Sequence, residues 1–163
     1  MTGTTEQAVV RKTITVKASV EHAFSVFTDA YDSWWPRSHH IGKSPMTEAI
    51  IEPRVGGRCY TTQVDGTECD WGQILEWDPP HRFVLAWQIT HEWGYQPDLA
   101  KSSEVEIRFT PVTGGTRVDL EHRHFERMGP GGDAMRIGVD SPNGWGDLLK
   151  LFAARAEKGA TLA

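Results

Sequence analysis

The sequence has few of the features that would place a protein outside the ordinary small globular class. Its 163 residues include two cysteines, Cys59 and Cys69, so the fold cannot depend on a disulfide framework. No stretch approaches the roughly 20 apolar residues of a membrane span, and the N-terminus lacks the apolar segment of a secretion signal. Lysine and arginine form no run and the net charge is −5. These absences argue against nucleic acid and membrane partners and favour a cytoplasmic protein.

Motifs for several kinds of catalysis are missing as well. The sequence has no GxSxG elbow, and its glycine pairs lack the lysine and the strand-to-helix context of a phosphate loop. It has no HExxH or CxxC, and the pair His122-x-His124, with Cys59 or His39 as a third ligand, matches no known zinc spacing. We therefore expect no metal and no cofactor, and whether the protein is an enzyme stays open.

The pattern of apolar residues predicts one α+β domain over residues 1–163, with the polar residues 1–8 as a disordered tail. A first strand at residues 9–17 is followed by a helix that Ser19 caps and by a second short helix that Pro36 ends. The remaining strands are expected at residues 47–52, 58–64, 69–77, 83–93, 103–112 and 116–125, and a long helix at residues 141–158, with Pro142 in its first turn. Such an order favours a helix-grip fold, in which a curved antiparallel sheet of six to seven strands wraps around the long C-terminal helix.

The dipeptide Asp65-Gly66 predicts a two-residue hairpin turn and thereby a register. In that register Tyr60 lies opposite Trp71 and Cys59 opposite Gly72, so the two cysteines face opposite sides of the hairpin, roughly 10 Å apart along the strand. We expect them to be small buried side chains and not a redox pair.

Six segments, taken together and in this order, resemble a known family. They are "ASVEHAFSVFTD", "WWPRSHHIG", "IEPRVGGR", "DGTECDWGQILEWDPPHRFVLAW", "SEVEIRFTPVTGGTRVDLEHRHFER" and "GWGDLLKLF". Over about residues 9–157 the chain resembles the START-like, or SRPBCC, superfamily of the birch-pollen allergen. Within it, the chain is similar to the AHSA-type branch, named for the activator of heat-shock-protein-ninety ATPase. One departure is Cys59, where this branch usually has a bulky aromatic residue.

The resemblance implies a helix-grip fold with a central cavity for hydrophobic ligands. Members include polyketide cyclases and aromatases, lipid carriers and co-chaperone domains, and the fold alone does not choose between them. We favour binding of a hydrophobic, aromatic small molecule, with or without slow cyclase-like or dehydratase-like chemistry. The alternative is a protein-interaction module like the chaperone activator. A chaperone partner is less favoured because the chain lacks that activator's additional N-terminal domain. Whether the protein forms a homodimer stays open.

Aromatic and histidine side chains are the candidate site residues, since the chain has seven tryptophans but only three tyrosines. An aromatic wall with a few polar groups is the usual form of a small-molecule site. The alternatives are that the tryptophans are ordinary core, that one loop histidine bonds its own loop while the other is solvated, and that the strand histidines are hydrogen-bonded core residues. His122 and His124 are also the candidate catalytic groups, because both are expected on the inward face of a strand. The expected ligand-binding residues are Trp34, Trp35, His39, His40, Tyr60, Trp71, Trp87, His122, His124, Trp145 and Phe152.

Gly144 and Gly146 flank Trp145, and glycine weakens a helix. We therefore expect residues 128–146 to open more readily than the rest of the last helix and to act as the gate for ligand entry.

Overall fold

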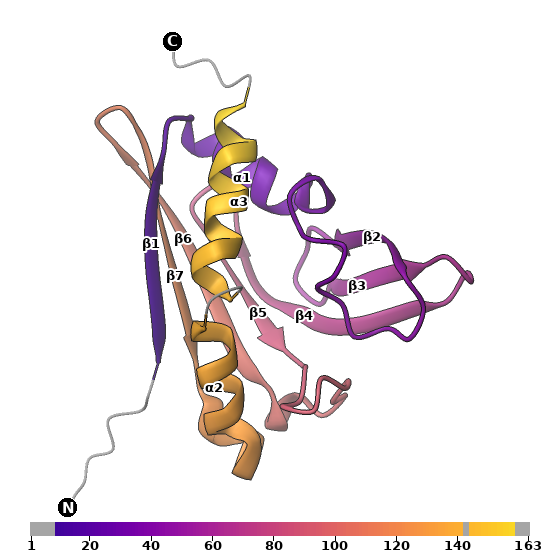
Figure 1. Cartoon of the computed structure of the whole chain (residues 1–163). Coiled ribbons are helices and arrows are strands. Elements are labelled where there is room, and N and C mark those ends of the chain that lie inside the picture. The colour runs from indigo at the N-terminus through magenta and orange to yellow at the C-terminus, as the bar shows by residue number, and fades with distance from the viewer. Residues whose placement is uncertain (1–8, 142–143, 159–163) are drawn as a thin grey trace, which may run out of the picture.

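The computed structural model of the protein describes residues 9–141 and 144–158. The expected disordered tail at residues 1–8 and the expected place of Pro142 in a helical turn lie outside the described residues. The fold is the predicted α+β helix-grip (Figure 1). Its elements are β1 (Val10–Val16), α1 (Val20–Thr28), the 3₁₀ helix η1 (Tyr31–Ser33), β2 (Met46–Ile51), β3 (Arg58–Gln63), β4 (Glu68–Asp78), β5 (Arg82–Trp87), the 3₁₀ helix η2 (Leu99–Lys101), β6 (Ser103–Val112), β7 (Gly115–Arg123), the 3₁₀ helix η3 (Phe125–Gly131), α2 (Gly132–Asp140) and α3 (Trp145–Glu157).

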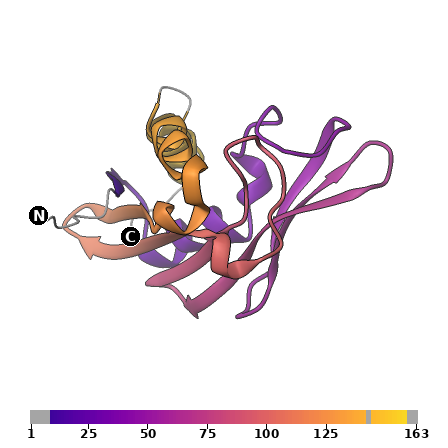
Figure 2. The ribbon, with the colours of Figure 1, turned by 90° about the horizontal axis from the view of Figure 1, so that it is seen from below.

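The seven strands form one antiparallel sheet in the order β1-β7-β6-β5-β4-β3-β2. Each strand from β2 to β6 pairs with the next along the chain, and β1 pairs with β7 at the opposite edge of the sheet from β2. The sheet curls, and α2 and α3 lie on the same side of it, as the view from below shows (Figure 2). Among the described residues, no helix has the length and apolar character needed to cross a membrane.

Helix boundaries follow from local sequence at α1 and α3. The Ser19 side chain accepts a hydrogen bond from the backbone N–H of His22, which caps α1 as predicted. On α3 the buried residues recur at helical spacing, and Leu151 on the opposite side is exposed. The buried stripe predicted for the last helix is thereby confirmed; it consists of Trp145, Leu148, Leu149 and Phe152.

The chain before α3 differs from the prediction. The sequence suggested a glycine-rich loop and then one helix from residue 141, whereas the structure has η3, α2 and only then α3, which begins at Trp145. Met135 and Val139, four residues apart, form the buried face of α2. The many glycines around them obscure this short pattern in the sequence.

The β3–β4 hairpin has a different register from the predicted one. Cys59 lies opposite Gly72, as expected, but a bulge then places Tyr60 opposite Asp70 and Cys69 opposite Thr61. Cross-strand partners share a face, so Cys69 lies on the same side as Cys59, and the prediction of opposite sides is wrong. Both thiols are nevertheless free. Burial raises the pKa of the Cys59 thiol well above its ordinary value, which makes it the small neutral core residue that we expected.

The outer face of the sheet carries a network of charges around Glu106. Arg82 Nε and Arg108 Nε donate hydrogen bonds to Oε2 of this carboxylate at 2.5 and 2.6 Å, and Arg123 donates to Oε1. Burial opposes the charge, but these hydrogen bonds outweigh it and lower the pKa of Glu106 to about 2. Polar residues thus cover the convex side, and the apolar interior lies on the side of the helices.

Candidate functional site

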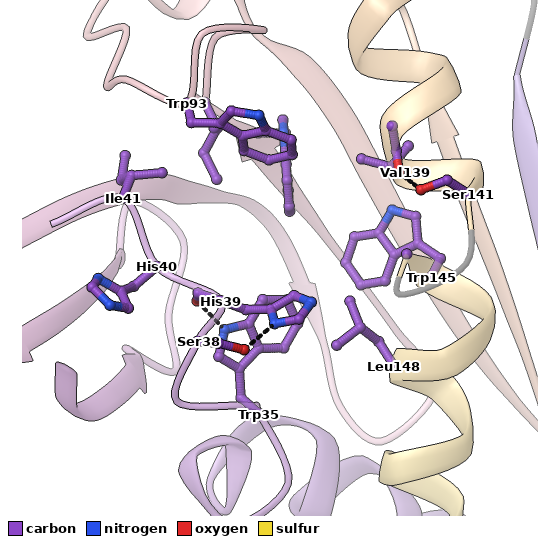
Figure 3. A pocket seen from close by; sticks show the side chains of 14 residues that line it. Trp35, Ser38, His39, His40, Ile41, Trp93, Val139, Ser141, Trp145 and Leu148 are labelled. Carbon is purple, nitrogen blue, oxygen red and sulfur yellow. Dashed lines mark hydrogen bonds between the residues drawn. The ribbon is translucent and has the colours of Figure 1, made fainter. Parts of the chain in front are cut away.

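A cavity of about 470 Å³ lies where the segment after η1, the end of β5, α2 and the start of α3 meet. Its size falls within the roughly 300–1,000 Å³ of small-molecule sites. Figure 3 shows Trp93, Trp145, Leu148 and Trp35 around the space. The lining residues are Trp35, Ser38, His39, His40, Ile41, Trp87, Ile89, Trp93, Gly138, Val139, Ser141, Gly144, Trp145 and Leu148.

Hydrogen bonds hold the segment that carries Trp35 and His39 in place. Asp32 accepts hydrogen bonds from the guanidinium of Arg37 at 2.5 and 3.0 Å and from the backbone N–H of Ala49 in β2 at 2.8 Å. The hydrogen bond from Arg37 is the main reason why the pKa of Asp32 is lowered. Asp32 therefore stays ionised at neutral pH and ties this segment to the sheet.

Trp35 forms one wall of the cavity, and aromatic rings support it from behind. Its indole lies 4.8 Å from the ring of Tyr31 and is parallel, within 3°, to that of Trp71 at 6.2 Å. Its Nε1–H donates to the carbonyl oxygen of His39 at 2.7 Å. The flat face of Trp35 is therefore fixed before any ligand arrives.

Trp145 at the start of α3 forms another wall, and His122 on β7 orients it. The indole N–H of Trp145 donates to Nδ1 of His122 at 3.0 Å, while Nε2 of His122 lies 2.8 Å from Ser103 Oγ. An indole N–H can only donate, so Nδ1 of His122 must be the acceptor. The ring proton is then on Nε2, and this N–H donates a hydrogen bond to Ser103 Oγ. Burial lowers the pKa of His122 to about 3. His122 is thus a neutral core residue that positions Trp145.

This arrangement corrects the expected role of His122. Both of its ring nitrogens are engaged, and it does not line the cavity. The interpretation as a hydrogen-bonded core histidine, left open on the sequence, is the correct one. A group whose pKa lies near 3 is also a poor general base at neutral pH.

His124 does not share the inward face of β7. The strand ends at Arg123, and His124 adopts φ +65°, a left-handed conformation that takes it out of the strand. Its Nδ1 lies 3.2 Å from Glu126 Oε2, and the residue does not line the cavity. The expectation that His124 lies on the inward face of the strand is wrong.

His39 and His40 both line the cavity, as expected. Nδ1 of His39 lies 3.1 Å from Ser38 Oγ, and the backbone of His39 bonds Pro36 and Trp35, so this histidine also stabilises its own loop. The ring of His39 lies next to Trp35, whereas the ring of His40 points away from the centre of the cavity (Figure 3).

The other expected site residues lie outside the lining. Trp34 and Phe152 are buried core residues whose rings contact Phe27, and Trp34 Nε1 donates to the Val26 carbonyl. Trp71 stands behind Trp35. Tyr60 alternates with the buried Cys59 and Thr61 and therefore faces outward, where Cζ of Arg58 lies 3.9 Å from the centroid of its ring; the bulge in β4 separates it from Trp71. The prediction for Tyr60 is therefore wrong.

Several lining residues were not among the expected ones. Trp93 was placed in a strand, but β5 ends at Trp87 and Trp93 lies in the connection that follows, with φ +63°. A Cβ added to Gly138 of α2 would lie 3.8 Å from Cζ2 of Trp93, so the two segments approach each other closely at the cavity. Trp93 is 53% exposed, which places it at the mouth. The sequence signal for such a position would have been the glycine directly after it.

The described residues, 9–141 and 144–158, contain no group of three or more histidine, cysteine or acidic side chains arranged to hold a metal ion. The polar side chains that line the cavity are the imidazoles of His39 and His40 and the hydroxyls of Ser38 and Ser141.

A family match covers most of the chain. Residues 17–157 match the family described as "Activator of Hsp90 ATPase homolog 1-like protein". The chain belongs to the AHSA1 family. This places it in the SRPBCC superfamily, as its sequence motifs suggested, with a ligand-binding fold.

Two solved structures of AHSA1-type proteins are similar in sequence as well as in fold. Txn09, described as an anthrahydroquino-γ-pyrone synthase, is 44% identical, with 93% of this chain and 99% of that chain covered and a TM-score of 0.64. CalC from Micromonospora echinospora, described as a self-sacrificing resistance protein, is 28% identical, with coverage of 96% and 99% and a TM-score of 0.67. No curated protein matches the chain.

Proposed function

We propose that this AHSA1-family protein binds a flat, polycyclic aromatic molecule in the cavity between α3 and the curled sheet. The observation that carries the proposal is the set of indole rings from four separate segments, Trp35, Trp87, Trp93 and Trp145, around one space of about 470 Å³. Aromatic rings bind other aromatic rings well because the contact removes a large apolar surface from water and because the ring quadrupoles favour offset or edge contacts. The similarity to Txn09, whose description names a polycyclic aromatic product, supports the same ligand class.

The test is a change that fills the cavity, paired with the same change outside it. Leu148 and Leu151 lie on the same helix, but Leu148 lines the cavity whereas Leu151 is 45% exposed. Leu148→Trp places a large ring into the binding space, while Leu151→Trp adds the same ring on the outer side of α3.

Binding of a panel of tri- and tetracyclic aromatic compounds is measured by quenching of tryptophan fluorescence, with titration calorimetry for stoichiometry. We expect one site per chain in the wild type, a loss of affinity of more than about tenfold in Leu148→Trp, and wild-type affinity in Leu151→Trp. If no compound of the panel binds the wild type, or if both variants bind alike, the cavity is not the binding site.

A second candidate function is ring closure on the bound molecule, which the place of His39 favours. A γ-pyrone fused to an aromatic ring forms when a phenolic oxygen attacks a side-chain carbonyl carbon. The new bond joins that oxygen to the carbonyl carbon, and the former carbonyl oxygen leaves as water. A base that removes the phenolic proton assists the attack, and His39 lines the cavity beside Ser38.

His39→Gln retains a polar side chain but cannot titrate. With an aromatic β-diketone substrate that bears a neighbouring hydroxyl, we expect this variant to lose turnover while ligand affinity is retained. His40→Gln is the matched control, because its ring points away from the centre of the cavity. Equal turnover in the wild type and in His39→Gln would exclude His39 as the base.

A further inference from the structure

The indole N–H groups around the cavity are not equivalent. Those of Trp35 and Trp145 donate to the His39 carbonyl and to His122 Nδ1, and neither is available to a ligand. Trp93 is more than half exposed. Trp87 differs from all three: it is 5% exposed, and its Nε1 is buried without a hydrogen-bond partner.

An unpaired N–H in such a place is unfavourable in the free protein. The great majority of buried donors have a partner, and each exception calls for an explanation. Tryptophan is normally buried only where its N–H reaches an acceptor. Trp87 lines the cavity, so a ligand oxygen that comes within hydrogen-bond distance of this N–H would gain a hydrogen bond without breaking one inside the protein.

The orientation of the Trp87 ring is set in advance. It lies edge-on to Trp71, Trp145 and His122, with centroid distances of 5.6, 5.5 and 5.1 Å. At the end of β5 its backbone is paired with Gly72 on one side and Ser103 on the other. A donor held in this way discriminates between ligands because it cannot turn to find another acceptor.

We propose that the indole N–H of Trp87 donates a hydrogen bond to a carbonyl oxygen of the ligand, so that the cavity selects aromatic ketones and quinones over aromatic hydrocarbons. This inference rests on the proposed binding function and adds the chemical group that the ligand must carry. The aromatic walls provide affinity for the ring system, and Trp87 provides the choice between ligands of the same shape.

The probes are fluorenone and fluorene, which share a ring skeleton and differ at one carbon, a carbonyl in the first and a methylene in the second. Their dissociation constants are measured by equilibrium dialysis, which does not depend on tryptophan emission. Trp87→Phe keeps an aromatic ring but removes the N–H. Trp93→Phe is the matched control, since it removes an indole from the same cavity at the solvent-exposed mouth.

We expect the wild type to prefer fluorenone. Trp87→Phe should lower the affinity for fluorenone by about tenfold and leave that for fluorene unchanged. Trp93→Phe should change both affinities by the same factor. An equal effect of Trp87→Phe on the two probes, or no effect, overturns the inference while the proposed binding function stands. If neither probe binds the wild type, the inference about Trp87 is wrong, and the panel of larger aromatic compounds decides the binding function.

A second measurement on the wild type does not depend on how the variant folds. In a ¹⁵N-indole NMR spectrum the Trp87 signal is identified by its absence in Trp87→Phe, or by its contacts to His122 protons if that variant is unfolded. Fluorenone should move this N–H signal downfield, as expected for a new hydrogen bond, and fluorene should not. An unmoved signal with fluorenone bound contradicts the proposal.

Discussion

Replacing His122 with glutamine separates the charge of this residue from its hydrogen bonds. In the folded protein its Nδ1 accepts from Trp145 and its Nε2–H donates to Ser103. A glutamine side chain offers one acceptor and one donor in a similar place but does not titrate. His122→Gln should therefore keep the fold and lose only the dependence on protonation.

The magnitude follows from proton linkage. Burial lowers the pKa of His122 from 6.5 to about 3, so between these values the unfolded chain binds a proton that the folded chain does not. Stability from this group is complete above pH 6.5 and is lost as the pH falls below it. The loss approaches about 1.4 kcal/mol for each pH unit, or about 2 kcal/mol between pH 7 and 5.

Urea unfolding followed by circular dichroism at pH 7, 6 and 5 measures this loss. We expect the free energy of unfolding of the wild type to fall by about 2 kcal/mol more than that of His122→Gln over this range. His124→Gln is the control, since His124 lies outside the strand beside Glu126, and it should follow the wild type. If His122→Gln loses stability as steeply as the wild type, the assignment of His122 as a buried neutral residue is wrong.

Three further predictions concern the outer sheet face, the cavity wall and the gate. Glu106→Gln should destabilise the protein by about 2 kcal/mol at pH 7, which is less than the full pKa shift suggests because the arginines are partly in solvent. The difference in stability between wild type and variant should vanish as the pH falls from about 4.5 to 2, because the wild-type carboxylate becomes protonated in this range. A difference that urea unfolding finds unchanged at low pH would refute this prediction. Trp87→Phe removes an unsatisfied donor, so urea unfolding of the ligand-free protein should show a free energy of unfolding that changes by less than about 1 kcal/mol. Trp145→Phe leaves Nδ1 of His122 without its donor and should lower the free energy of unfolding by about 2 kcal/mol. Equal losses of stability in the two variants would contradict the hydrogen-bond assignments. Amide hydrogen exchange should be faster at residues 128–141 and 144–146 than at 148–157, and it should slow in the first two ranges when an aromatic ligand binds. Uniform protection would argue against a gate there.

The sequence was sufficient for the fold because the signals that define it are local and strong. Alternating apolar residues in β6 and β7, the Ser19 cap and the helical spacing from Trp145 to Phe152 each appear as predicted. The weak points were those where one residue changes the geometry. The bulge in β4 leaves Trp71 without a partner on β3, so Trp71 does not share the outer face of Tyr60, and a sign of it in the sequence is Gly72, a glycine inside a strand.

The candidate site was predicted less well, because a cavity depends on where chain segments meet. Trp35, Trp87, Trp145, His39 and His40 do line it. Trp93, however, reaches it from an irregular connection in which a left-handed backbone replaces the expected strand, and α2 reaches it from a segment whose glycines hid a helix. His122 holds Trp145 in place and does not contact the cavity. This follows from its hydrogen bonds to Trp145 and Ser103, which no sequence pattern encodes.

Intermolecular nuclear Overhauser effects between a bound polycyclic aromatic ketone and the protein test the central claim most directly. The account predicts contacts from the ligand protons to the ring protons of Trp35, Trp87 and Trp145 together, because these three indoles line the one cavity. Contacts confined to exposed aromatic residues such as Tyr95, with none to these buried rings, would contradict the account.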